Sequence, residues 1–81
     1  MQICVRFWSY FSDLTGTPSV LLELPDGSTV GDAVLAVEKR FPALTPARRC
    51  TLLAVGVDYA QAEQILQSQD ELSLFPPVQG G

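Results

Sequence analysis

Apolar side chains alternate along the first stretch of the chain. In QICVRFW, residues 2–8, every second side chain falls on the same side of an extended backbone. One side then carries Ile3, Val5 and Phe7, and the other carries Cys4, Arg6 and Trp8. This period of two predicts a first strand. The stretch SVLLELPDG, residues 19–27, alternates in the same way up to a Pro-Asp-Gly turn, so we expect a second strand that pairs antiparallel with the first.

A helical period marks the middle of the chain. Apolar residues recur there at i, i+3, i+4, i+7 and i+11, namely at Val30, Ala33, Val34, Val37 and Phe41. Thr29 precedes this stripe as a natural N-cap, Asp32 places a negative charge in the first turn, and Pro42 disfavours helical geometry at the residue before it. These signals predict the main helix between Thr29 and Pro42. A shorter helical turn is expected within residues 9–17.

The polar residues of this middle region carry no evident site. Glu38 and Lys39 lie on the polar face of the main helix, which we interpret as solvated surface. The following stretch PALTPARRC, residues 42–50, holds two prolines and predicts a loop. We interpret its pair Arg48 and Arg49 as solvated charges, with docking of an acidic partner as the alternative.

The last part of the chain predicts two more strands. TLLAVGVDY, residues 51–59, is an apolar run of strand length interrupted by Gly56, where we expect a turn with positive φ. The next segment predicts a short helical turn or a loop with Ile65 and Leu66 directed inward. DELSLF, residues 70–75, predicts the last strand. One of its faces carries Leu72 and Leu74, and the other carries Ser73 and Phe75.

The order of these elements predicts the fold class. Strands before and after one main helix imply a mixed sheet with that helix packed across one face, which is an α+β domain. A ubiquitin-like β-grasp is the compact arrangement we expect. Single cores usually serve chains of about 100 to 150 residues and many shorter chains fold alone, so we expect a single domain over residues 1–81. Residues 75–81 are expected to protrude from it as an extended Gly-Gly tail.

Composition and charge narrow the classes of function. With 47% hydrophobic and 17% charged residues the chain is too apolar for disorder, and no apolar run approaches the ~20 residues that span a bilayer. The start lacks a secretion signal, so we expect a cytoplasmic protein that does not bind membranes. Nine acidic against five basic residues give a net charge of −4, which argues against nucleic acid and for a partner with a basic face.

Two residue types that often carry chemistry are scarce. Histidine is absent, which removes the commonest general base and the commonest metal ligand. This absence argues against an autonomous hydrolase or a metalloenzyme, and we expect no metal site. Cys4 and Cys50 form neither a CxxC motif nor a zinc-ligand spacing, so we interpret both as free, partly buried thiols.

The stretch FPPVQGG, residues 75–81, is predicted to extend away from the sheet. Pro76 and Pro77 lack N–H donors and have a fixed φ, so a sheet cannot continue through them and the chain is held extended. The six residues from Pro76 onward then reach about 20 Å, which is enough to enter a deep pocket of another protein. Gly80 and Gly81 have no Cβ and can pass a narrow channel. Either they are a frayed end of no consequence, or the carboxylate of Gly81 is the working group.

A carboxylate needs activation before it can react, because it is a poor electrophile and a poor nucleophile. The simplest route is an acyl-adenylate of Gly81 made from ATP by a partner enzyme, whose acyl group a nucleophile then captures. A sulfur donor would give a thiocarboxylate, which is a sulfur atom carried on the end of a protein. A lysine amine would give a ubiquitin-like conjugate instead.

The stretch DELSLFPPVQGG, residues 70–81, resembles the end of the small subunit of molybdopterin synthase, a MoaD/ThiS-like sulfur carrier with the ubiquitin fold. That family has an acidic pair, an apolar strand and a near-fixed Phe-Pro-Pro-Val-x-Gly-Gly ending. Weaker similarity in VRFWSYFSDLTGT and TLLAVGVDY extends the resemblance over the whole chain. Sulfur carriers of the thiamine pathway also end in Gly-Gly, but they typically lack the Phe-Pro-Pro segment. One departure is Gly56, where many relatives carry Asn, and both residues tolerate positive φ.

The resemblance implies a sulfur-donating subunit without an active site or a bound cofactor of its own. An E1-like enzyme would use ATP to adenylate the carboxylate of Gly81, next to Gly80. A sulfur donor such as a cysteine desulfurase or a rhodanese-like protein would convert it to the thiocarboxylate. The large subunit of molybdopterin synthase, in a heterotetramer with this chain, would then transfer the sulfur to cyclic pyranopterin monophosphate in molybdenum cofactor biosynthesis.

The resemblance also implies a docking surface for that large subunit. It consists of Trp8, Tyr59 and Phe75, with Pro76, Pro77 and Val78 leading into the partner's pocket. The strand patterns place Trp8 and Phe75 opposite the main apolar stripes, which suits an exposed aromatic patch. The alternative is that these side chains cover a second small core.

Three other functions are compatible with the same features. The chain could carry sulfur for thiamine or for tRNA thiolation, or it could be a ubiquitin-like modifier that is joined to lysines. A plain interaction domain with an idle tail is the third alternative.

Overall fold

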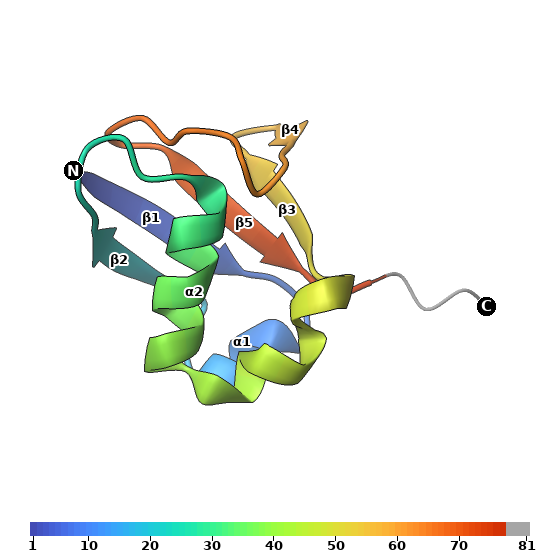
Figure 1. Cartoon of the computed structure of the whole chain (residues 1–81). Coiled ribbons are helices and arrows are strands. Elements are labelled where there is room, and N and C mark those ends of the chain that lie inside the picture. The colour runs from blue at the N-terminus through green and yellow to red at the C-terminus, as the bar shows by residue number, and fades with distance from the viewer. Residues whose placement is uncertain (78–81) are drawn as a thin grey trace.

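A computed structural model describes residues 1–77 of the chain. Its elements are β1 (Gln2–Phe7), α1 (Phe11–Thr15), β2 (Ser19–Glu23), α2 (Val30–Arg40), the 3₁₀ helix η1 (Pro42–Cys50), β3 (Leu52–Val55), β4 (Asp58–Tyr59) and β5 (Glu71–Phe75). Within these residues the strands form one sheet in the order β2-β1-β5-β3-β4, and α2 lies across one face of it (Figure 1). β1 and β5 are parallel, whereas the other neighbouring strands are antiparallel. The predicted α+β class, with a mixed sheet packed against one main helix, is confirmed.

The core lies between α2 and the face of the sheet turned toward it. The predicted alternation holds in β1 and β5, whose inward side chains are Ile3, Val5, Phe7, Leu72 and Leu74. The predicted stripe of α2 meets them with Val30, Ala33, Val34 and Val37, all buried. Side chains of the opposite parity on the same strands point to the outer face of the sheet, which α2 does not cover.

The start and the end of α2 agree with the sequence signals. Asp32 donates its backbone N–H to Thr29 Oγ1 at 3.1 Å, and Thr29 donates its backbone N–H to Asp32 Oδ2 at 2.9 Å. This capping box satisfies two backbone donors that the start of a helix leaves without partners. At the other end the helix stops at Arg40, and Phe41 is the C-cap before Pro42.

Three local predictions are wrong. Pro42–Cys50 forms a 3₁₀ helix instead of a loop, because Pro42 stands in the first turn, where it loses no hydrogen bond, and the buried Leu44 ties the segment to the core, although Pro46 lies inside the helix. Leu66 is directed inward as expected, but Ile65 is 56% exposed. Ile65 forms a β-bridge in an extended stretch, where successive side chains point to opposite sides. Cys50 is a free thiol as expected, but it is exposed at the end of η1.

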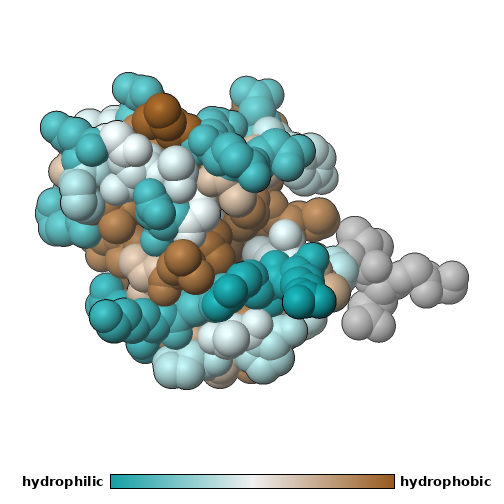
Figure 2. Space-filling model, in the orientation of Figure 1, coloured by the Kyte–Doolittle hydropathy of each residue, from teal (hydrophilic) through white to brown (hydrophobic). Residues whose placement is uncertain are grey.

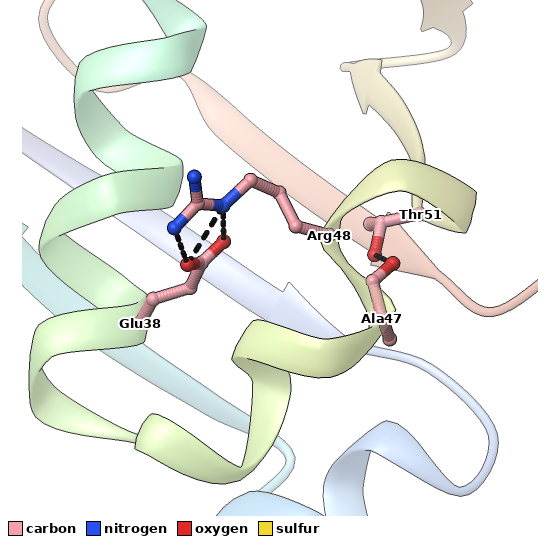
Figure 3. A network of polar contacts seen from close by, with 4 residues as sticks. All are labelled: Glu38, Ala47, Arg48 and Thr51. Carbon is pink, nitrogen blue, oxygen red and sulfur yellow. Dashed lines mark hydrogen bonds and ion pairs between the residues drawn. The ribbon is translucent and has the colours of Figure 1, made fainter.

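The interpretation of Glu38 as solvated surface is also wrong, whereas the Arg48 side chain is 49% exposed as expected but pairs with Glu38. The Glu38 side chain is only 5% exposed, and Arg48 Nε lies 2.8 Å from each of its carboxylate oxygens, while Nη2 donates to Oε1 (Figure 3). The hydrogen bond and the negative charge of Glu38 raise the pKa of Arg48 above its ordinary value. This pair joins α2 to η1 across 10 positions of sequence, and a pattern of single positions does not reveal such a contact.

Some predictions reach beyond the described residues. The single domain over residues 1–81 stays a prediction. Of the predicted tail 75–81, Phe75 is the last residue of β5, and Pro76 and Pro77 follow it. Val78, Gly80 and Gly81 lie outside the described residues. None of the helices in residues 1–77 is long and apolar enough to cross a membrane, and the cytoplasmic location stays a prediction.

Candidate partner-binding surface

The outer face of the sheet carries the aromatic residues that the sequence singled out. Trp8 directly follows β1, Phe75 ends β5, and Tyr59 ends β4. The register places Phe75 opposite Leu52 and Tyr59 opposite Ala54, and these two β3 residues share one face of the strand. The backbone N–H of Trp8 donates to a carbonyl oxygen of β5 at 3.1 Å, which ties the end of β1 to the strand that precedes the prolines.

These residues surround an open pocket of about 600 Å³. Its walls include Trp8, Tyr59, Phe75, Pro76 and Pro77, together with Ser9, Tyr10, Leu52, Ala54, Gly56 and Val57. The structure therefore brings together every described residue that was predicted to bind a partner. Their role in partner binding stays a prediction.

The aromatic side chains at this pocket are partly or largely exposed, and two of them stack. The rings of Trp8 and Phe75 have centroids 5.4 Å apart and planes inclined by 13°. Trp8 is 39% exposed and Tyr59 is 80% exposed, while Phe75 is half-buried. Side chains that covered a second small core would be buried, so the geometry favours an exposed aromatic patch. We call Trp8, Tyr59, Phe75, Pro76 and Pro77 the aromatic surface.

Sequence reasoning missed part of this pocket. Leu52 and Ala54 line it because their side chains point to the outer face, directly opposite the positions of Phe75 and Tyr59. The alternation in the stretch LLAV contained a signal for these two residues. Gly56, which begins the turn to β4, has a φ of +60°, so the expected positive φ is confirmed.

A second pocket, of about 540 Å³, lies on the other side of β3. Its apolar lining comes from Val34, Leu35, Leu53 and Ala62. Successive side chains of a strand point to opposite faces, so Leu53 lines this pocket while its neighbour Leu52 lines the first. Figure 2 shows this side of the molecule, with hydrophobic residues in a hollow between hydrophilic ones. The aromatic surface contributes none of its residues to this pocket.

Comparison with known proteins supports the fold and the family that the sequence predicted. The ThiS family model matches residues 5–81. The molybdopterin synthase sulfur carrier subunit of Arabidopsis thaliana is 35% identical over 81 residues, which cover 100% of this chain and 84% of that protein. The crystal structure of SAMP1, small archaeal modifier protein 1, from Haloferax volcanii superimposes with a TM-score of 0.88 at 25% identity, and the match covers 100% of both chains.

A solved complex of subunits 1 and 2 of the molybdopterin-converting factor from Helicobacter pylori 26695 contains a chain with the same fold. That chain matches with a TM-score of 0.71 at 20% identity, again over 100% of both chains. These neighbours confirm the predicted ubiquitin-like β-grasp. Because the family model covers nearly the whole chain and a curated relative exceeds 30% identity, this chain belongs to the ThiS family, whose curated relatives include molybdopterin synthase sulfur carrier subunits.

Proposed function

We propose that this protein is the sulfur carrier subunit of a molybdopterin synthase, with the carboxylate of Gly81 as the group that carries sulfur. The proposal rests on the family match and on one structural observation. The partly exposed stack of Trp8 and Phe75 lies in the same pocket wall as Pro76 and Pro77, which directly precede Val78–Gly81 in the sequence. A partner that binds this aromatic surface would therefore hold the carrier next to the start of its tail.

The chemistry of the proposed cycle falls on Gly81 and on enzymes that are partners of this chain. An E1-like enzyme joins the Gly81 carboxylate to AMP from ATP and releases pyrophosphate. A persulfide on a cysteine desulfurase or a rhodanese-like protein attacks the acyl carbon and displaces AMP. A thiol then cleaves the S–S bond, and the thiocarboxylate remains on the carrier. This chain supplies the acyl group and needs no catalytic side chain of its own.

The proposed acceptor is cyclic pyranopterin monophosphate in the active site of the large subunit. Two sulfur atoms are required for each dithiolene, so carriers must bind and leave in turn. The net charge of −4 on this chain suits a partner with a basic face, which would also bind the phosphate of the acceptor. The two-subunit complex from Helicobacter pylori provides the analogy for such an assembly.

Intact-mass spectrometry tests the proposal most directly. The protein would be incubated with ATP, its cognate adenylating enzyme and a sulfur donor, and we expect a mass gain equal to the replacement of one oxygen by sulfur. Deletion of Gly81 should abolish the gain, whereas Gln79→Ala, which keeps the length of the tail, should retain it. The thiocarboxylated wild type should then donate its sulfur to cyclic pyranopterin monophosphate when the large subunit is added. Product formation by the Gly81-deleted chain would refute the proposal.

A second candidate, a ubiquitin-like modifier, is favoured by the likeness to SAMP1. Here the acyl group of Gly81 would be captured by lysine amines of target proteins. Lys39 is the only lysine of this chain and is exposed in the last turn of α2, so lysine-linked chains of this protein would have to pass through it. Higher-mass adducts with an isopeptide bond to Gly81, and the loss of self-linked species in Lys39→Arg, would identify this function. Carriage of sulfur for thiamine or for tRNA thiolation would be seen as thiocarboxylate formation without conversion of the pterin.

A further inference from the structure

Arg6 occupies an unusual place in the sheet. It is the only lysine or arginine in the strands that the structure describes, and it points to the outer face next to the aromatic surface. The register places Arg6 directly opposite Ser73 of β5. Ser73 is 4% exposed although it lies on the face that α2 leaves open, so neighbouring side chains of the sheet must cover it.

The guanidinium of Arg6 makes two contacts along this face. Nη1 lies 3.7 Å from Glu71 Oε1, and both side chains are about half exposed. The guanidinium carbon also lies 4.9 Å from the centroid of the Trp8 ring, within the range of a cation–π contact. The same Trp8 ring stacks on Phe75. Arg6 and Phe75 therefore both contact the Trp8 ring, and Phe75 directly precedes Pro76.

The Glu71 contact contributes little to folding, because exposed ion pairs between long side chains gain little free energy in water. The contact of Arg6 with Trp8 instead affects the orientation of the Trp8 ring. Trp8 comes after the last residue of β1, and Ser9 behind it adopts a left-handed φ of 54°, so the chain turns away from the sheet at this point. No strand residue of β1 follows Trp8, so its contacts with Arg6 and Phe75 are two of the interactions that orient the indole.

We propose that Arg6 is a positioning residue, which holds the Trp8 ring against Phe75 and thereby sets the shape of the aromatic surface that a partner binds. The partner-binding part of this inference rests on the proposed function. The stack itself does not, because it is a property of the free chain. Lysine would keep the positive charge but not the planar guanidinium, so we expect it to replace Arg6 only in part.

Trp8 is the only tryptophan of the chain, so its optical signals report on this stack alone. Three variants separate the possible roles. Arg6→Leu removes the guanidinium and keeps a residue that strands accept, and Arg6→Lys keeps the charge but not the plane. Arg40→Leu is the matched control, because Arg40 makes a comparable contact with Phe41, 5.5 Å from the ring centroid, at the end of α2.

We expect Arg6→Leu to lose near-ultraviolet circular dichroism from Trp8 and to increase the quenching of its fluorescence by acrylamide, with little change in Tm. Arg6→Lys should recover part of both signals, and Arg40→Leu should leave them at the wild-type level. Unchanged Trp8 signals in Arg6→Leu would overturn the proposal. A fall in Tm as large as that of a core variant would overturn it as well, because Arg6 would then act through overall stability.

Calorimetric titration with the cognate large subunit measures the consequence for binding. Arg6→Leu should bind about two- to fivefold more weakly, which is the factor that corresponds to the loss of one exposed cation–π contact. Arg40→Leu should bind like the wild type. Altered Trp8 signals with unchanged affinity would overturn the positioning role. Failure of the wild type itself to bind the large subunit would instead refute the proposed function, and the Trp8 signals would still decide whether Arg6 holds the stack.

Discussion

Two arginine–glutamate pairs lie on opposite faces of this sheet, and their surroundings differ. On the side of α2, Arg48 donates to both carboxylate oxygens of the buried Glu38. On the outer face, Arg6 and Glu71 make a single longer contact between half-exposed side chains. Both arginines are about half exposed, but Glu38 is buried and Glu71 is not, so loss of the arginine is costly in the first pair and inexpensive in the second. The second pair contributes little to stability, and its arginine instead contacts an exposed aromatic ring.

The largest expected effects are on folding stability and on partner binding, and they differ between two neighbouring residues of β5. Leu74 is buried on the inner face, whereas Phe75 belongs to the outer aromatic surface. Leu74→Ala should lower the free energy of unfolding by about 2–5 kcal/mol, because it leaves a cavity in the core. Phe75→Ala should destabilise the chain less, yet weaken binding of the large subunit by roughly tenfold or more, as for a truncated aromatic anchor. Urea unfolding and calorimetric titration of both variants measure the two effects, and equal losses of stability would contradict the separation of the faces.

The second largest expected effect is the loss of folding stability when Arg48 is replaced. Arg48→Leu should destabilise the protein more than Arg49→Leu, because it leaves the buried carboxylate of Glu38 without its partner. The pKa of Arg48 is raised in the folded state, so its stabilisation is fully present below the ordinary pKa of arginine and is lost only above the raised value. The difference in stability between wild type and Arg48→Leu should therefore not shrink between neutral and mildly alkaline pH. Chemical unfolding at several pH values checks this, and equal stability of the Arg48 and Arg49 variants would show that the pair is dispensable.

The smallest effect on stability belongs to Tyr59. Its side chain is largely exposed, so Tyr59→Ser should change the free energy of unfolding by no more than about 0.5 kcal/mol. The same variant should weaken binding of the large subunit, because Tyr59 lines the pocket of the aromatic surface. Ile65→Ser serves as the control, since Ile65 is an exposed apolar residue outside that pocket. Equal affinity of the Tyr59 variant and the wild type would remove Tyr59 from the partner-binding surface.

Much of the candidate site could be predicted because strands and helices repeat with fixed periods. The alternation in residues 2–8 already placed Trp8 on the face opposite Val5, and the alternation in residues 70–75 did the same for Phe75. The contributions of Leu52 and Ala54 needed the pairing of β3 with β4 and β5, which the sequence does not state. The stack of Arg6 on Trp8 was missed for a similar reason, since alternation gives the face of a side chain but not its contacts on that face.

By itself, the sequence determined the main elements, the α+β class, the capped start of α2 and the motif that identifies the family. Each of these depends on residues close together in the chain, whose spacing, caps and prolines act through local backbone geometry. Only the tertiary structure decided that Glu38 is buried against Arg48, that residues 42–50 are helical, and that Ile65 points outward. These outcomes depend on which distant segments pack together. The free energy of a charged or apolar side chain depends on whether the fold surrounds it with water, with apolar groups or with a partner charge.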